Sequence, residues 1–184
     1  MLWFKRISVV LLILILLVAG FLYFALRSSL PLYEGEWPAE VSQSAEISRD
    51  AQGYASIKGQ NRNDVAYALG FVHAQERFFQ MDLLRRNASG ELSELFGEIA
   101  LELDKKRRIH RFRAKAERGF ATLPAEQKLL LQRYTAGVNA GLAELGWPPF
   151  EYGLLAQTPR NWVEADSFLA LYSMYLDLQG AEGK

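Results

Sequence analysis

The sequence contains no cysteine and only two histidines among its 184 residues. The lack of cysteine excludes a disulfide scaffold, a thiolate metal site and a cysteine nucleophile. His110 has no cysteine, aspartate or second histidine at metal-ligand spacing, so we predict a structural or solvated side chain. For His73, inside a predicted buried helix, we favour a hydrogen-bonded structural role over that of a catalytic base.

The short motifs that mark common active sites are also missing. The sequence has no Gly-x-Ser-x-Gly elbow, glycine-rich phosphate loop, His-Glu-x-x-His pair or carboxylate pattern of a calcium loop. The formal charge is zero. Outside the N-terminal apolar run and its flanks, the chain has 18 basic and 21 acidic residues. This acidic balance argues against a general nucleic-acid binder.

One long apolar run is present near the N-terminus. Residues 7–26 are interrupted only by Ser8 and Gly20, and these twenty residues are followed by a poor cleavage site. Such a run matches a bilayer core and exceeds the ~7–15-residue core of a cleavable signal. We predict an uncleaved transmembrane signal anchor, with a removed signal peptide as the alternative.

Positive charges around this run predict its orientation. Lys5 and Arg6 precede the run and Arg27 alone follows it, which places residues 1–6 in the cytoplasm. Residues 27–43 contain prolines and a glycine and read as an extended linker.

After the linker, the pattern predicts a β-hairpin. Residues 45–48 and 54–57 alternate small or apolar with polar side chains, and Asp50 and Gly53 supply turn chemistry between them. Because an isolated hairpin is marginally stable in water, we expect these strands to join a larger sheet.

The next stretch predicts a long buried helix capped by Asn61 or Asn63. Apolar side chains surround it almost completely, at positions Val65, Ala68, Leu69, Phe71, Val72, Phe78, Phe79, Met81 and Leu83. The charged residues within this helix need partners. Asp82 can reach Arg85 or Arg86 at helical spacing, and Arg77 also needs a partner. This helix has more apolar surface than the other elements can cover, so we expect the domain to be incomplete alone.

Further helices follow. Gly90 and Gly97 bracket a short helical turn, and residues 104–118 are rich in basic side chains. We favour a solvated helix face for this basic stretch, with Ile109, Phe112 and Ala116 turned inward. The alternative is a nucleic-acid or anionic-lipid patch.

Two C-terminal helices complete the predicted elements. Pro124 opens a helix that Gly146 ends. Asn161 and Glu164 resemble a capping box for the last helix, whose predicted inward residues are Phe168, Leu171, Tyr172 and Tyr175.

An ordered set of motifs carries a family resemblance. It consists of Arg49-Asp50-x-x-Gly53-x-x-x-Ile57, Asp64, Ala68-x-Gly70-Phe71-Val72-His73-Ala74-Gln75-Glu76-Arg77-Phe78-Phe79-Gln80-Met81-Asp82, Arg85-Arg86, Gly90-Glu91-Leu92-x-Glu94-Leu95-x-Gly97, Tyr134-x-x-Gly137-Val138-Asn139-Ala140, Pro159-x-x-Trp162 and Asp166. Over residues 44–180 the chain resembles the α-chain of the penicillin acylase family of N-terminal-nucleophile hydrolases. The resemblance implies a mainly α fold with a short β-hairpin, the α-chain part of an αββα sandwich, preceded here by one transmembrane helix. Residues 44–184 would form this α-chain-like domain, incomplete without a β-chain.

The resemblance also implies an activity. Family members hydrolyse linear carbon–nitrogen (amide) bonds of acylated small molecules, such as β-lactams or acyl-homoserine lactones, as heterodimers cut from one exported precursor. Their nucleophile is the serine that begins the β-chain, so we assign no catalytic residue and no metal ligand to this chain and predict that it is inactive alone. The α-chain would supply scaffold and one wall of the acyl pocket, through the candidate substrate-binding residues Met174, Tyr175 and Leu178. Ordinary core packing of these three residues is the alternative.

The remaining expectations concern cofactors, partners and location. No cofactor is required, although some complete members bind Ca²⁺ through an α-chain glutamate that would fall at or just past Lys184, with Glu182 the nearest candidate. The expected partners are the β-chain, a small-molecule amide substrate and the membrane, with no nucleic acid. The expected location is the bacterial inner membrane, single-pass, with the C-terminal domain facing the periplasm or exterior. The rival interpretations are a non-catalytic anchored interaction domain, an inactive truncated fragment, and an anionic-lipid binder that uses residues 105–118.

Overall fold

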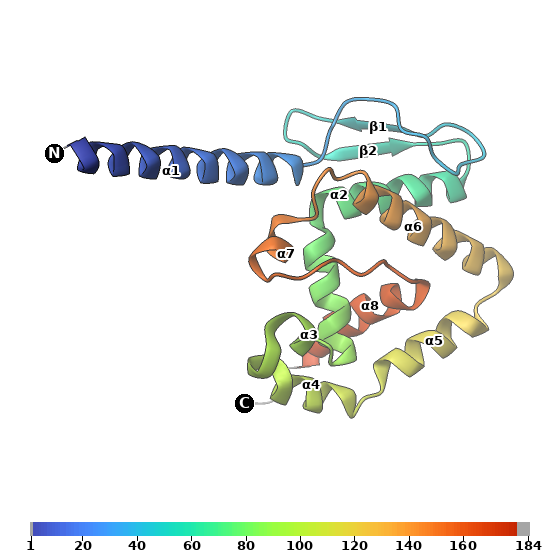
Figure 1. Ribbon diagram of the computed structural model, residues 1–184. Helices are drawn as coiled ribbons and strands as arrows, with labels where there is room; N and C mark the ends of the chain where they lie inside the picture. Colours follow the sequence, from blue (N-terminus) through green and yellow to red (C-terminus); the bar gives the residue numbers. More distant parts are fainter. Residues whose placement is uncertain (1, 180–184) are drawn as a thin grey trace.

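A computed structural model describes residues 2–179 of the chain (Figure 1). The described part is mainly helical with one short hairpin, as predicted. Its elements in order are α1 (Leu2–Ser28), β1 (Glu46–Arg49), β2 (Ala55–Lys58), α2 (Arg62–Ser89), α3 (Ser93–Phe96), the 3₁₀ helix η1 (Gly97–Ala100), α4 (Leu101–Arg108), α5 (Phe112–Thr122), α6 (Ala125–Ala143), α7 (Phe150–Leu154) and α8 (Glu164–Gln179).

Helix α1 projects away from the other elements (Figure 1). Its segment Arg6–Ser28 is long and apolar enough to cross a membrane and is not buried against the rest of the chain. A signal sequence near the N-terminus has the same properties, so length and composition do not separate the two roles.

The predicted hairpin is confirmed. Strands β1 and β2 pair antiparallel, with Ile47 opposite Ile57. In the turn, Oδ1 of Asp50 accepts hydrogen bonds from the backbone N–H groups of Gln52 and Tyr54, and Gly53 has a φ of +86°. Within the described residues the sheet has two strands, so the larger sheet stays a prediction.

Helix α2 is the central element, with α6 and α8 packed along it (Figure 1). Asn61 caps its start by accepting from the backbone N–H of Asp64 at 2.9 Å. The carboxylate of Asp64 in turn accepts from the backbone N–H groups of Ser42 and Gln43, which ties the linker to the helix.

Helix α2 is kinked at Arg77, where φ is −152° and ψ is 32°. At the kink, 63% of the Arg77 side chain is exposed, and its guanidinium finds a partner in the Glu76 carboxylate at 3.7 Å. Leu69, predicted to face inward, is also exposed. Most of the other apolar residues on this helix are buried, which agrees with a sequence that is apolar on almost all sides of the helix.

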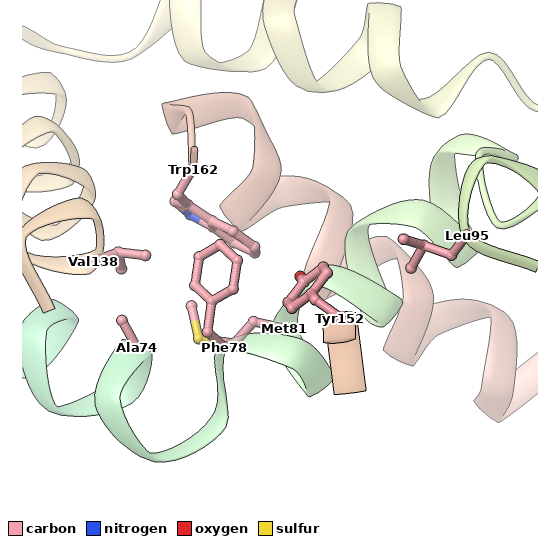
Figure 2. Close-up of a cluster of buried hydrophobic side chains, with 7 residues drawn as sticks. All are labelled: Ala74, Phe78, Met81, Leu95, Val138, Tyr152 and Trp162. Carbon is pink, nitrogen blue, oxygen red and sulfur yellow. The ribbon is translucent and has the colours of Figure 1, made fainter. Parts of the chain in front are cut away.

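Two hydrophobic clusters flank α2. The first joins α2 to α3, α6, α7 and the segment before α8 (Figure 2), through Ala74, Phe78, Met81, Leu95, Val138, Tyr152 and Trp162. The second joins the end of α2 to α5 and α8, through Ala88, Phe112, Ala116, Ala165, Leu169 and Leu176.

The C-terminal helices differ from prediction in three places. The basic stretch forms two helices because the chain breaks at Arg111, which has a φ of +53°. Ile109 therefore lies at an exposed corner, whereas Phe112 and Ala116 are buried as predicted. Helix α7 lies between the two predicted C-terminal helices, where no element was predicted. Helix α8 begins at Glu164 rather than being capped by Asn161, and the carboxylate of Asp166 accepts from the backbone N–H of Val163.

Candidate functional site

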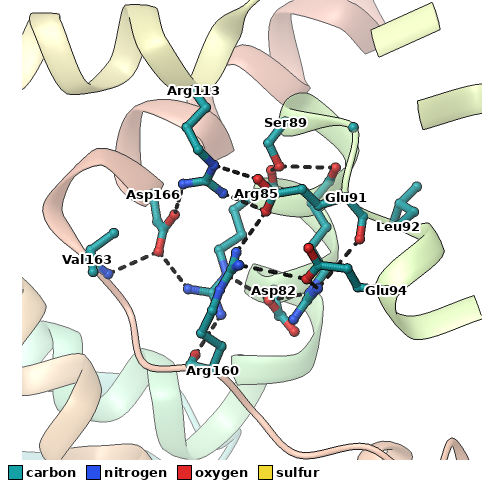
Figure 3. Close-up of polar contacts among 12 residues, drawn as sticks. Asp82, Arg85, Ser89, Glu91, Leu92, Glu94, Arg113, Arg160, Val163 and Asp166 are labelled. Carbon is teal, nitrogen blue, oxygen red and sulfur yellow. Dashed lines mark hydrogen bonds and ion pairs between the residues drawn. The ribbon is translucent and has the colours of Figure 1, made fainter. Parts of the chain in front are cut away.

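A buried ion network holds α2 to α8 (Figure 3). At its centre, Arg85 is fully buried on α2. Its guanidinium donates to Asp82 and Asp166, at 2.6 Å each, and to the backbone carbonyls of Arg160 and Asn161. These contacts fix the segment before α8 and the first turn of α8 against α2.

Asp82 is shared among three donors. Its Oδ1 accepts from Arg85 and, at 2.9 Å, from Arg86, and its Oδ2 accepts from the Tyr152 hydroxyl at 2.6 Å. Burial and the neighbouring carboxylate both raise the pKa of Tyr152, so the phenol stays protonated and donates. The predicted pairing of Asp82 is thus confirmed with both arginines.

Glu91 forms the outer part of the same network (Figure 3). Its carboxylate accepts from Arg113 at 2.6 and 2.7 Å and from Arg160 at 2.8 Å. Burial by itself would raise the pKa of Glu91, but the hydrogen bonds and charges of the two arginines outweigh burial and lower it to about 2. Arg113 also reaches Asp166 at 3.3 Å, which links both parts of the network.

This network joins elements of the fold. Its carboxylates and guanidinium groups pair with one another, so the charges that a nucleophile or base would need are already engaged. Sequence analysis missed the contributions of Tyr152 and Glu91, because helical spacing finds partners only within one helix.

His73 and Tyr134 form a second polar pair, between α2 and α6. His73 Nδ1 lies 3.0 Å from the Tyr134 hydroxyl. Burial and the charge of Arg77 lower the pKa of His73, while Glu76 acts in the opposite direction. Burial raises the pKa of Tyr134 to about 12. The neutral, hydrogen-bonded pair agrees with the structural role predicted for His73.

The predicted substrate-binding residues lie together on one face of α8. Met174, Tyr175 and Leu178 are 56%, 53% and 74% exposed. Leu171 is 60% exposed and extends the set to i, i+3, i+4 and i+7 spacing, which is one helical stripe. We call Leu171, Met174, Tyr175 and Leu178 the bare face of α8.

The bare face corrects two predictions. Leu171 and Tyr175 were expected to face inward, and both are exposed. The inward side of α8 is instead formed by Ala165, Leu169, Ser173 and Leu176. Core packing of Met174, Tyr175 and Leu178 within this chain is therefore wrong, whereas their contact with a substrate stays a prediction.

The described residues contain no group of three or more potential metal-ligating side chains that could hold an ion. Glu182, the nearest candidate for calcium, lies outside the described residues.

The fold and the site together define a helical scaffold segment, with a small hairpin, an internal charge network and a bare apolar face.

Comparison with known proteins gives the family. The sequence profile described as penicillin amidase matches residues 44–184. The chain is 42% identical over 139 residues to the penicillin acylase 2 proenzyme of Pseudomonas sp. (strain SE83), covering 75% of this chain and 18% of that protein. It is 34% identical over 143 residues to the acyl-homoserine lactone acylase QuiP of Pseudomonas aeruginosa, covering 77% of this chain and 17% of that protein. The chain therefore belongs to the penicillin amidase family, and it spans less than a fifth of the length of these relatives.

A solved structure shows the same fold. The thermostable penicillin G acylase from Alcaligenes faecalis matches with a TM-score of 0.69 at 23% identity, over 78% of each chain. The resemblance inferred from the motifs is thus confirmed at the level of family and fold.

Proposed function

We propose that this chain is the α-segment of a membrane-anchored acylase that hydrolyses linear amide bonds of acylated small molecules. The observation that carries the proposal is the family match over residues 44–184. Relatives named as a penicillin acylase and an acyl-homoserine lactone acylase support β-lactams or acyl-homoserine lactones as substrate classes.

In the proposed reaction, the catalytic groups belong to a β-chain made with this chain as one precursor. The hydroxyl of the N-terminal serine attacks the amide carbon, and its α-amino group takes the proton and passes it to the departing amine. Water then hydrolyses the acyl ester. An amine with an ordinary pKa of about 7.7–8.0 can act as this base near neutral pH.

The role of this chain is to position one wall of the acyl pocket. Arg85 and Asp166 hold the start of α8, and Asn87 donates to Ser173 at 2.8 Å further along the helix. With the inward side so anchored, the bare face points away from the core. A contiguous stripe of large apolar side chains marks a contact surface, which we assign jointly to the β-chain and the acyl group of the substrate.

The test combines this chain with the β-segment encoded beside it. We expect hydrolysis of an N-acyl amide with a chromogenic amine only when both segments are present and the β-segment begins with serine. An assembled heterodimer without hydrolysis of any acyl amide would contradict the proposal and favour a non-catalytic anchored domain.

The acyl-pocket assignment has its own test. Met174→Ala and Leu178→Ala should change KM for long relative to short acyl chains in the assembled enzyme. The matched control is Leu129→Ala, because Leu129 is 41% exposed on α6 and lies outside the bare face. Equal KM values for all three variants and the parent would contradict the assignment of α8 to the pocket.

For the N-terminus, we propose that α1 anchors the chain in the bacterial inner membrane with residues 44–184 facing the periplasm or exterior. The apolar length of α1 and the charge difference across it support this orientation.

A further inference from the structure

The segment between α6 and α7 is attached to the end of α1. The backbone N–H of Trp147 donates to the carbonyl of Ser28 at 3.0 Å, and Gly146 lies against the same residue. The ring of Trp147 meets that of Phe21 edge to face, with 6.1 Å between their centroids. Gly146 and Trp147 therefore lie beside the last two turns of α1.

These contacts fix the level of Trp147 along the candidate span. Phe21 and Ser28 are seven residues apart, about 10 Å along a helix axis. The span Arg6–Ser28 has 23 residues and a length of about 34 Å, slightly more than the ~30 Å hydrocarbon core. When α1 crosses a bilayer, the Trp147 backbone, at the level of Ser28, falls at the boundary between headgroups and acyl chains, and its indole reaches inward toward Phe21. Tryptophan is enriched at this boundary in membrane proteins.

Two residues after Trp147 add exposed apolar side chains near the end of α1. Phe150 and Leu154 on α7 are 46% and 79% exposed. Phe150 lines a cavity of about 400 Å³ together with Leu30, which is exposed just after α1. Figure 1 shows α7 beside the end of α1, on the side of the domain from which α1 projects.

The charges near this surface suit a lipid headgroup region. Arg27 lies in the last turn of α1, and the exposed guanidinium of Arg77 lines the same cavity as Phe150. Two acidic residues, Glu76 and Glu151, also line this cavity, and the Glu76 carboxylate lies 3.7 Å from the Arg77 guanidinium. Arginines at this level can pair with lipid phosphates, while the apolar side chains enter the boundary.

We propose that residues 146–154 form a second membrane contact, in which Trp147, Phe150 and Leu154 insert into the lipid interface beside α1. The domain then contacts the bilayer surface directly and is not attached to the membrane through α1 alone. This inference rests on the proposed insertion of α1.

The test uses the absence of native cysteine, which allows single nitroxide labels on the full chain in vesicles of phosphatidylcholine and phosphatidylglycerol. Labels are placed by Phe150→Cys, Leu154→Cys and Val18→Cys, where Val18 reports on insertion of α1. The control is Leu129→Cys, because Leu129 is 41% exposed and the first half of α6 lies at the far side of the domain from α1 (Figure 1). Depth is measured from collisions with oxygen relative to a water-soluble nickel complex.

We expect the label at Phe150 and the label at Leu154 to shift toward oxygen accessibility, at interface depth, and the label at Leu129 to stay aqueous. A buried label at Val18 with aqueous labels at Phe150 and Leu154 would overturn the inference and leave the anchor intact. An aqueous label at Val18 would overturn both. If Phe150→Cys reduces the helical circular dichroism, Leu154→Cys decides the test, because its native side chain is mostly exposed.

Discussion

The two halves of α2, on either side of the kink at Arg77, are held by opposite means. The first half meets α6 backbone to backbone. A Cβ atom added at Gly70, Gly137 or Gly141 would lie 2.2, 1.9 or 2.3 Å from a backbone oxygen of the facing helix. The second half meets α8 through Arg85, whose side chain is fully buried.

The difference shows two ways of making one helix pairing specific. Close contact of these glycines with backbone carbonyls of the facing helix permits only one crossing of α2 and α6, since any side chain there would push the backbones apart. The ion network permits only one placement of α8, since each buried charge needs its partner at hydrogen-bond distance. The halves should therefore respond to different changes.

The largest effect is expected for Arg85→Ala. The variant leaves Asp82 and Asp166 without their central partner, and breaking a buried pair in this way costs about 3–5 kcal/mol. The matched control is Arg77→Ala on the same helix, where an exposed side chain predicts a change within about 0.5 kcal/mol. Thermal unfolding of the full chain in micelles, followed by circular dichroism, measures both. Equal shifts in Tm would mean that the network does not hold the second half.

A somewhat smaller effect is expected for Gly137→Ala. Its new methyl group would meet the Tyr67 carbonyl at 1.9 Å, so the helices must separate, at a cost of about 1–3 kcal/mol. The control is Gly119→Ala on α5, where the nearest atom is a Phe168 ring carbon at 3.4 Å. That variant should be neutral or stabilising by up to about 1 kcal/mol, because alanine is the better helix former. The same micelle experiment separates the two, and a stable Gly137→Ala chain would refute the close crossing.

A pH-dependent effect is expected just after the end of α2, where Glu91 pairs with Arg113 and Arg160. The pKa of Glu91 is lowered to about 2 from an ordinary value of 4.5. Its contribution to stability is therefore complete above about pH 4.5 and is lost as the pH falls toward about 2.

Glu91→Gln should accordingly lower Tm at about pH 6 and reduce the further loss of Tm between about pH 5 and about pH 3. The control, Glu102→Gln, removes an exposed ion pair with Lys105 and should change little at either pH. Amide exchange adds a spatial check, because acid should open α5 and α8 before α6. Simultaneous opening of all three helices would contradict the division between the halves.

The smallest effect on stability is expected for Leu178→Ala on the bare face of α8. This exposed side chain should contribute within about 0.5 kcal/mol, whereas Leu169→Ala on the inward side should cost about 2–5 kcal/mol. Thermal unfolding of the chain in micelles compares the two. A large loss for Leu178→Ala would show that the bare face already packs within the chain.

Several features were readable from the residues because they depend on local chemistry. The hairpin follows from Asp50 and Gly53, the start of α2 from Asn61, and the pairing of Asp82 from helical spacing. The family could be inferred because its motifs occur in order along the chain.

Other features depended on contacts between distant residues. The partners of Arg85 on α8 and of Asp82 on α7 are 81 and 70 positions away, and no helical or strand period links them. The direction of α8 was mispredicted at Leu171 and Tyr175 because that helix has large apolar side chains on both sides. Which side faced the core was decided by Asp166 and Ser173 meeting Arg85 and Asn87.

The sequence by itself thus determined the hairpin, the start of α2, the family and the apolar character of α1 and α8, since each depends on neighbouring residues or on motifs in order along the chain. Only the tertiary structure decided the kink at Arg77, the shared charges around Arg85, the contact of Trp147 with α1 and which face of α8 stays bare. The physical reason is that burial of a charge or an apolar face is settled by what packs against it, and those partners lie far away in the chain.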